Sequence, residues 1–258
     1  MNLTIDIGNS RTSIGLFQGD ALAFRADYVT DAQGGAVALE ACLRSFAAQA
    51  QTALGELPAV TAAAAACVVS GLGEACQAAV RSTYGVSPVM CSAFTAGALF
   101  DADYPQPSEI GADRVADAIA VRAFYGAPAV VVDFGTATNI EVINRDGAFL
   151  GGIIAPGLET SMDALFSHAS KVKRVEVDEP PAAIGVSTRG AVLSGIVYGE
   201  ADRADGLVRR IFAQLGYRAQ VIATGGLAGF VARYSAEITQ VDADLTLRGL
   251  NLLCGGAR

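Results

Sequence analysis

The chain has 258 residues, of which 52% are hydrophobic and 17% are charged. This composition is typical of a globular protein with a large core, and it excludes an intrinsically disordered chain. Lysine and arginine number 18 and aspartate and glutamate 26, which gives a net charge of 18 − 26 = −8. A domain-wide nucleic-acid surface would need the opposite sign, so we expect no nucleic-acid partner.

Mean hydropathy is +0.40, but the longest apolar stretch, residues 58–73, is shorter than the ~20 residues needed to cross a bilayer. The N-terminus, MNLTIDIG, has no basic segment and no apolar segment before a cleavage site. We therefore expect a cytoplasmic protein with no membrane partner. Five cysteines without a CxxC spacing predict reduced thiols, not disulfides or a structural zinc site. The single histidine, His168, disfavours Ser-His-Asp hydrolysis and His-rich metal sites.

The N-terminal part opens with three short apolar runs, and a turn suited to a tight hairpin, Gln18-Gly19-Asp20, precedes the third. These runs predict strands at residues 3–7, 12–17 and 21–28. Apolar spacing, alanine-rich runs and clusters of Asp, Pro and Ser predict the elements that follow. In chain order they are a helix at 36–54, a buried strand at 63–69, a helix at 74–84, a strand at 88–90, a loop at 98–110 and a helix at 112–125.

The C-terminal part begins with a strongly apolar run, AVVVD, that predicts a core strand. A turn at Arg145-Asp146-Gly147 separates the next two predicted strands. In chain order we expect strands at 129–133, 138–144 and 148–154, a helix at 158–169, a charged loop at 171–181, a helix at 187–215, a strand at 220–224, a helix to about 234 and a last helix at 244–254.

One short sequence repeat links the N-terminal and C-terminal parts of the chain. Residues 3–16 read LTIDIGNSRTSIGL and residues 130–143 read VVVDFGTATNIEVI. In both segments an apolar strand leads into Asp-x-Gly, a short polar turn and a second apolar strand, at a constant offset of 130 − 3 = 127 residues. A repeated unit of this kind predicts two similar α/β halves that face each other. We assign these halves to residues 1–112 and 113–258.

The two Asp-x-Gly hairpins carry candidate chemistry. A tight turn between strands presents backbone N–H groups and small hydroxyls to a polyphosphate, and glycine lets that ligand approach the backbone. Asp6, at a strand end, is suited to a hydrated magnesium ion. Each hairpin alone is equally typical of an ordinary turn. The pair together favours a nucleotide held between two lobes.

Two further segments are ambiguous when taken singly. Gly225-Gly226 follows a strand and suits the sugar or base of a nucleotide, but it is equally a simple strand–helix turn. In Gly111-Ala112-Asp113-Arg114, the carboxylate can accept a hydroxyl proton and the guanidinium can clamp a carboxylate or phosphate. From that tetrapeptide alone, a surface helix start is the favoured interpretation.

Several nucleotide-binding signatures do not occur in the sequence. There is no G-x-x-x-x-G-K-[ST] segment, so a P-loop NTPase is excluded. The protein-kinase set of motifs is not assembled, although Asp133-Phe134-Gly135 occurs. No G-x-G-x-x-G opens a helix, which argues against a Rossmann dinucleotide site.

The double hairpin with a later Gly-Gly resembles the superfamily of actin, hexokinase, sugar kinases and acetate kinase. Within that superfamily, the sequence segments of this chain resemble those of the type III pantothenate kinases. The segments occur in the family's order and cover nearly the whole chain. The matching segments are DIGNSRTSIGLF at 6–17, YPQPSEIGADR at 104–114, VVDFGTATNIEVI at 131–143, GGIIAPGL at 151–158, STRGAVLSGIVYG at 187–199, IATGGLA at 222–228 and VDADLTLRGL at 241–250.

The resemblance implies an actin-like, ribonuclease H-like ATPase fold and ATP-dependent phosphorylation of pantothenate to 4'-phosphopantothenate, the first step of coenzyme A biosynthesis. It also implies a homodimer, with Asp113 as the base. The other implied positions are Asp6, Ile7, Gly8, Asn9, Ser10, Arg11, Thr12, Ser13 and Thr136 for ATP, Tyr104, Gly111, Ala112, Asp113, Arg114 and Thr188 for pantothenate, Asp6 for Mg²⁺, and Asp133 for K⁺ or NH₄⁺.

The chain departs from the family pattern in both hairpins. The first reads Asn9-Ser10-Arg11, where Asn-Thr-Asn is usual, and the second reads Thr138-Asn139, where two threonines are usual. Three alternatives stay open from the sequence: a kinase of another small hydroxy acid or sugar, a non-catalytic nucleotide-binding regulator, and a structural scaffold.

Overall fold

The computed structural model describes residues 1–56, 59–169 and 173–255. The chain forms two compact units, one made of Met1–Tyr125 with the residues from Leu245 onward, and the other made of Gly126–Asp244. Each unit is built on one five-stranded mixed sheet. Among the helices of the described residues, none combines the length and apolarity that a bilayer span requires.

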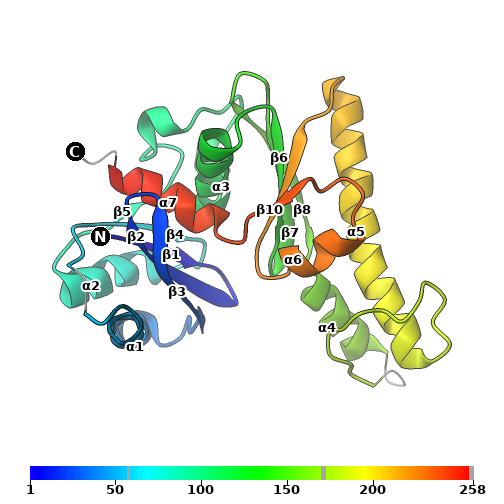
Figure 1. The fold of residues 1–258 in the computed structure, drawn as a ribbon, viewed down its shortest axis with the longest axis horizontal. Helices are drawn as coiled ribbons and strands as arrows, with labels where there is room; N and C mark the ends of the chain where they lie inside the picture. The colour runs from blue at the N-terminus through cyan, green and yellow to red at the C-terminus, as the bar shows by residue number, and fades with distance from the viewer. Residues whose placement is uncertain (57–58, 170–172, 256–258) are drawn as a thin grey trace. The chain divides into compact units, whose positions relative to one another are not determined.

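The sheet of the first unit has the strand order β3-β2-β1-β4-β5, in which β1 is antiparallel to β2 and parallel to β4. In Figure 1, α1 and α2 lie on one side of this sheet, and α3 and α7 on the other. The elements of this unit are β1 (Asn2–Ile7), β2 (Arg11–Gln18), β3 (Ala21–Val29), α1 (Gly35–Leu54), β4 (Ala62–Cys67), α2 (Leu72–Tyr84), β5 (Val89–Met90), η1 (Gly97–Leu99), η2 (Pro107–Glu109), α3 (Ala112–Phe124) and α7 (Leu245–Gly255).

Strand β4 is an alanine-rich segment that helix propensity alone would assign to a helix. The residues Ala63 to Ala66 are all buried, because β4 lies between β1 and β5 and is covered by helices on both faces. A short run that is buried on both sides favours a strand through its sheet pairing, and this outweighs the local preference. The predicted buried strand at 63–69 is therefore confirmed, with slightly shorter bounds.

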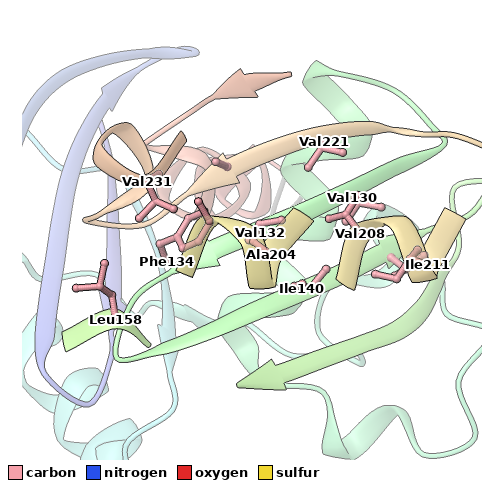
Figure 2. Close-up of a cluster of buried hydrophobic side chains, with 14 of the residues drawn as sticks. Val130, Val132, Phe134, Ile140, Leu158, Ala204, Val208, Ile211, Val221 and Val231 are labelled. Carbon is pink, nitrogen blue, oxygen red and sulfur yellow. The ribbon is translucent and has the colours of Figure 1, made fainter. Parts of the chain in front are cut away.

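The second unit repeats this plan. Its sheet has the order β8-β7-β6-β9-β10, and α5 packs against the apolar face. Figure 2 shows Val130, Val132 and Phe134 of the central strand facing Ala204 and Val208 of that helix. The elements of this unit are β6 (Ala129–Phe134), β7 (Ala137–Ile143), β8 (Phe149–Pro156), α4 (Leu158–His168), α5 (Thr188–Leu215), β9 (Gln220–Thr224), α6 (Ala228–Val231), η3 (Ala232–Tyr234) and β10 (Gln240–Val241).

The two sheets match strand for strand. Strand β6 is antiparallel to β7 and parallel to β9, as β1 is to β2 and β4. The sequence repeat between residues 3–16 and 130–143 is therefore a structural duplication, as the sequence predicted. The second turn is one residue shorter, because Asp6 pairs with Ser13 whereas Asp133 pairs with Asn139.

The boundary between the compact units differs from the expected boundary after residue 112. Helices α3 and α7 both belong to the first unit. They pack so closely that a side chain at Gly249 would overlap the carbonyl of Ala116. Thr246 donates a hydrogen bond of 2.7 Å to Asp117 across the same contact. Helix α7 therefore completes the first unit, although 119 residues of the chain (244 − 126 + 1) separate it from Tyr125.

The predicted elements otherwise agree with the structure to within a few residues. The loop expected at 98–110 contains two short 3₁₀ segments at its edges, η1 and η2. The two-residue strand β10 was not predicted. Lys171, in the loop predicted at 171–181, lies outside the described residues.

Candidate active site

The first hairpin turn, between β1 and β2, is held from one side by Thr30. The Thr30 hydroxyl donates to the Gly8 carbonyl at 2.7 Å, and the Thr30 N–H donates to the Ser10 carbonyl at 3.1 Å. A trans peptide directs its N–H away from its carbonyl, so the N–H groups of Asn9 and Arg11 point away from Thr30. Exposed N–H groups that share a direction are what an anion-binding nest needs.

Arg11, the charged departure from the family pattern, is drawn toward a neighbouring strand. Its guanidinium lies 3.8 Å from the Asp27 carboxylate, and its side chain is 57% exposed. Arg25 donates to both oxygens of the same carboxylate, at 3.1 and 3.2 Å. An exposed ion pair of this kind contributes little to stability. The next residue, Thr12, is buried with its hydroxyl 2.9 Å from that of Thr30, so it supports the turn.

Asp6 and Asp113 are distant in sequence, but the charges of both act on the thiol of Cys91. Burial first, and then the charges of Asp113, Asp117 and Asp6, together raise the pKa of Cys91 to about 12. Asp6 is the next-to-last residue of β1 and pairs with Ser13 across the hairpin. The expected magnesium ligand and the expected base thus both belong to the first unit.

Asp113 lies in the first turn of α3, which begins after Gly111. Burial raises the pKa of the Asp113 carboxyl, while the N–H and the charge of Arg114 oppose the rise. The Arg114 N–H donates to Asp113 Oδ1 at 2.8 Å. A Cβ atom at Gly111 would lie 2.5 Å from the same oxygen, so only glycine leaves the carboxylate in place. Tyr104, the other expected substrate contact of this unit, is half-buried in the segment before η2.

Cys91 is a residue that sequence reasoning missed. Its thiol donates to the carbonyl of Ala112 at 3.3 Å, and its N–H donates to the carbonyl of Ala65 at 2.7 Å. The start of α3 is thereby tied to strand β4. Nothing in the spacing of the cysteines indicates this contact, because it joins residues that come together only through the fold.

The second hairpin turn, between β6 and β7, is braced by the start of α4. The carbonyl of Thr136 accepts the N–H of Gly157 at 3.0 Å and the hydroxyl of Thr160 at 2.6 Å. The Gly135 N–H donates to the Ala137 carbonyl at 3.0 Å, which closes the turn. The side chain of Thr136 is exposed, as a ligand contact requires.

Asp133, the expected cation ligand, is the next-to-last residue of β6 and lies beside two glycines. Gly225 has a φ of +91°, and a Cβ atom there would overlap Asp133 Oδ1 and lie 2.7 Å from the Phe134 carbonyl oxygen. A Cβ atom at Gly135 would lie 3.9 Å from the same carboxylate oxygen. The backbone at Gly225 can therefore come close to the Asp133 carboxylate and the Phe134 carbonyl only because residue 225 is glycine. Both of these groups offer oxygen, the donor atom that suits a hard cation. Gly225-Gly226 therefore serves the Asp133 environment as well as a strand–helix turn.

A buried polar cluster supports the base of the second hairpin. Thr138 donates to Glu200 Oε1 at 2.5 Å, and Arg203 bonds to the other oxygen of Glu200. Arg203 also donates to the Pro156 carbonyl at 2.6 Å. Helix α5 thus holds both β7 and the end of β8.

Thr188, the expected substrate contact in the second unit, is the first residue of α5 and follows the capping residue Ser187. It borders an open cavity of about 420 Å³ between α4 and α5. The remaining lining residues are apolar or small: Leu165, Ala191, Val192, Gly195 and Ile196. One hydroxyl on an apolar wall suits a ligand that has both aliphatic and polar parts.

The expected residues are divided between the two units. The first unit holds the hairpin from Asp6 to Ser13 with Tyr104 and the segment from Gly111 to Arg114, and the second holds Asp133, Thr136 and Thr188. Over residues 1–56, 59–169 and 173–255, no three His, Cys, Asp or Glu side chains are grouped so as to hold a metal ion.

Comparison with known proteins identifies the family. The family model for type III pantothenate kinases matches residues 2–210. A type III pantothenate kinase of Frankia alni is 40% identical over 254 residues, with 98% of each chain covered, and one of Desulfosudis oleivorans is 38% identical over 260 residues, with both chains fully covered.

Solved structures show the fold at lower identity. Ethanolamine utilization protein EutJ from Carboxydothermus hydrogenoformans is 17% identical, with a TM-score of 0.58 over 97% of this chain and 89% of that one. The polyphosphate/ATP-glucomannokinase of an Arthrobacter strain is 13% identical, with a TM-score of 0.56 over 99% and 98% of the two chains. These likenesses confirm the expected actin-like α/β fold with two duplicated halves. The chain belongs to the type III pantothenate kinase family.

Proposed function

We propose that this protein transfers the γ-phosphoryl group of ATP to the primary hydroxyl of pantothenate, giving 4'-phosphopantothenate and ADP, the first step of coenzyme A biosynthesis. The observation that carries the proposal is the partly buried Asp113 carboxylate at the start of α3, whose pKa is raised by burial, in a chain of this family. Its raised pKa makes it a stronger base than an exposed aspartate, as proton removal from an alcohol requires.

The proposed step involves one bond made and one bond broken. The pantothenate hydroxyl oxygen attacks the γ-phosphorus, the bond from that phosphorus to the bridging oxygen breaks, and ADP leaves. The hydroxyl proton passes to the Asp113 carboxylate, which the Arg114 N–H holds in position. Such a transfer depends mainly on positioning and on neutralisation of charge.

The phosphates of ATP would lie on the two hairpin turns. The N–H groups of Asn9 and Arg11 and the exposed Thr136 side chain are the contacts that these turns offer. Asp6 would hold Mg²⁺ and Asp133 would hold K⁺ or NH₄⁺, since a carboxylate oxygen suits a hard cation. When bound, these cations supply positive charge that offsets the phosphates.

Pantothenate has a carboxylate, an amide and a dimethylated carbon, so it needs both a cationic and an apolar contact. We assign its carboxylate to Arg114 and its remaining contacts to Tyr104, Gly111, Ala112 and Thr188. The apolar cavity that Thr188 borders supports its part of that assignment.

We also propose a homodimer in the cytoplasm. Ile184 and Val186, next to Thr188, are 83% and 98% exposed. An exposed apolar strip of this kind is what a partner subunit would cover.

The test is ADP release by the purified protein with ATP, Mg²⁺ and pantothenate, in K⁺ or NH₄⁺ and then in Na⁺. Turnover that requires pantothenate and K⁺ or NH₄⁺ supports the reaction and the cation site. Turnover with other small hydroxy acids or sugars, but not with pantothenate, would show that the enzyme phosphorylates another substrate. Binding of ATP without turnover on any acceptor would favour the regulator alternative.

A further inference from the structure

The start of α4 contacts the second hairpin through one backbone oxygen. The Thr136 carbonyl accepts two hydrogen bonds, from the Gly157 N–H at 3.0 Å and from the Thr160 hydroxyl at 2.6 Å. All three residues belong to the second unit. We call Gly157 and Thr160 the carbonyl clamp.

The Thr160 bond is not the local bond that a helical threonine usually forms. A threonine inside a helix commonly donates its hydroxyl to the carbonyl four residues earlier. Thr52 in α1 does this, donating to the Ala48 carbonyl at 2.9 Å. Thr160 instead crosses 24 residues of sequence to reach Thr136. The hydroxyl therefore serves the hairpin and not its own helix.

Gly157 contributes through its missing side chain as well as its N–H. A Cβ atom there would overlap the Gly135 carbonyl oxygen and lie 2.7 Å from the Thr136 carbonyl oxygen. The backbone of α4 can thus approach both peptides of the turn only because residue 157 is glycine. Any larger residue would push the turn away from the helix.

The clamp determines which way the Thr136–Ala137 peptide faces. Its carbonyl is directed to α4, so the N–H of Ala137 is directed to the opposite side. The exposed Thr136 side chain belongs to the same turn. A turn that is held in one orientation before binding loses less entropy when a polyphosphate binds.

We propose that Gly157 and Thr160 are positioning residues for nucleotide binding, which act by holding the Thr136 peptide in the orientation that receives the phosphates of ATP. This proposal rests on the proposed function, because it takes Thr136 as an ATP contact. It assigns no role to either residue in binding pantothenate.

The experiment compares Thr160→Val with Thr160→Ser and with a matched control, Thr52→Val. Valine keeps the shape of threonine and removes the hydroxyl, whereas serine keeps the hydroxyl. Thr52 is the control because it also sits on an exposed helical face and donates to a backbone carbonyl. For each variant, the ATP Kd is measured by calorimetry without acceptor, and the KM values for ATP and pantothenate are measured in the ADP-release assay.

Loss of one hydrogen bond predicts that Thr160→Val raises the ATP Kd and KM by about 2- to 13-fold and leaves the pantothenate KM unchanged. Thr160→Ser and Thr52→Val are expected to behave as the unchanged protein. Gly157→Ala should raise the ATP Kd more than Thr160→Val does. If Gly157→Ala fails to fold, the comparison of Thr160→Val with Thr160→Ser still tests the proposal.

An unchanged ATP Kd in Thr160→Val would refute the positioning role of the carbonyl clamp. An equal rise in the KM values for ATP and pantothenate would also refute it. The outcome is separable from failure of the proposed function, because ATP binding is measured without pantothenate. A chain that binds ATP but does not phosphorylate pantothenate would still test the clamp through Kd, and a chain that binds no ATP would refute both ideas.

Discussion

Replacing Asp113 by asparagine should separate catalysis from stability. Asparagine has nearly the same shape, and its side-chain oxygen can still accept the Arg114 N–H that now donates to Asp113 Oδ1 at 2.8 Å. The geometry at the start of α3 is therefore expected to survive, and what is lost is the ability to take a proton. The expected fall in kcat is about 10²- to 10⁴-fold, or about 3–5 kcal/mol of activation free energy. The pantothenate KM should change little.

The same substitution should stabilise the fold at neutral pH. Burial raises the pKa of the Asp113 carboxyl above the ordinary value of an aspartate. A carboxyl whose folded pKa is raised contributes stability that is present below its unfolded pKa and lost as the pH rises through the folded pKa. At pH 7 the partly buried charge therefore opposes folding, and Asp113→Asn removes it. The difference in stability should shrink as the pH falls through the raised pKa toward the ordinary carboxyl range.

The assays are ADP release as a function of pH and thermal melting at pH 7 and in acid. Asp178→Asn is the matched control, since Asp178 is exposed and a hydrogen bond from Arg189 is the main cause that lowers its pKa. That variant should keep full activity and should gain no stability at pH 7. Near-normal kcat in Asp113→Asn would refute the base role, and a lower melting temperature at pH 7 would refute the burial argument.

Three further substitutions test other parts of the structure. Gly249→Ala should force α7 away from Ala116, lowering the free energy of unfolding by about 1–3 kcal/mol and the melting temperature by about 2–4 °C per kcal/mol; an unchanged melting curve would contradict the close helix contact. Asp133→Asn should reduce the difference in turnover between K⁺ and Na⁺, and a variant with the full K⁺ response would exclude Asp133 as the cation ligand. Thr188→Val should raise the pantothenate KM by about 2- to 13-fold through loss of one hydrogen bond with the ATP KM unchanged, and the reverse pattern would remove Thr188 from the substrate site.

Much of the fold follows from local patterns. The apolar runs on either side of each Asp-x-Gly turn predict the hairpins, because strand periodicity and turn chemistry are both encoded within about a dozen residues. The sequence repeat between residues 3–16 and 130–143 predicts the duplicated α/β halves for the same reason. The sequence predicts Asp113 in the first turn of a helix. The structure agrees, because α3 begins at Ala112, the residue before it.

The features that the sequence did not predict depend on contacts between distant segments. An amphipathic pattern shows that α7 has a buried face, but it does not show which sheet that face covers. The two-residue strand β10 is too short to produce any periodicity. The hydroxyl of Thr160 has no signal in its own helix, because its acceptor lies on the second hairpin.

The discontinuous first unit has a consequence for biosynthesis. The second unit is one continuous stretch, so all of its residues have been synthesised before α7 begins. Helix α7 packs against β1, β4 and α3, so the first unit lacks one of its helical covers until the ribosome has passed Leu245. Domains generally fold as units during synthesis. The segment that emerges second is therefore expected to reach its native structure first, while the N-terminal segment completes its fold only after α7, which follows the whole second unit, has been synthesised.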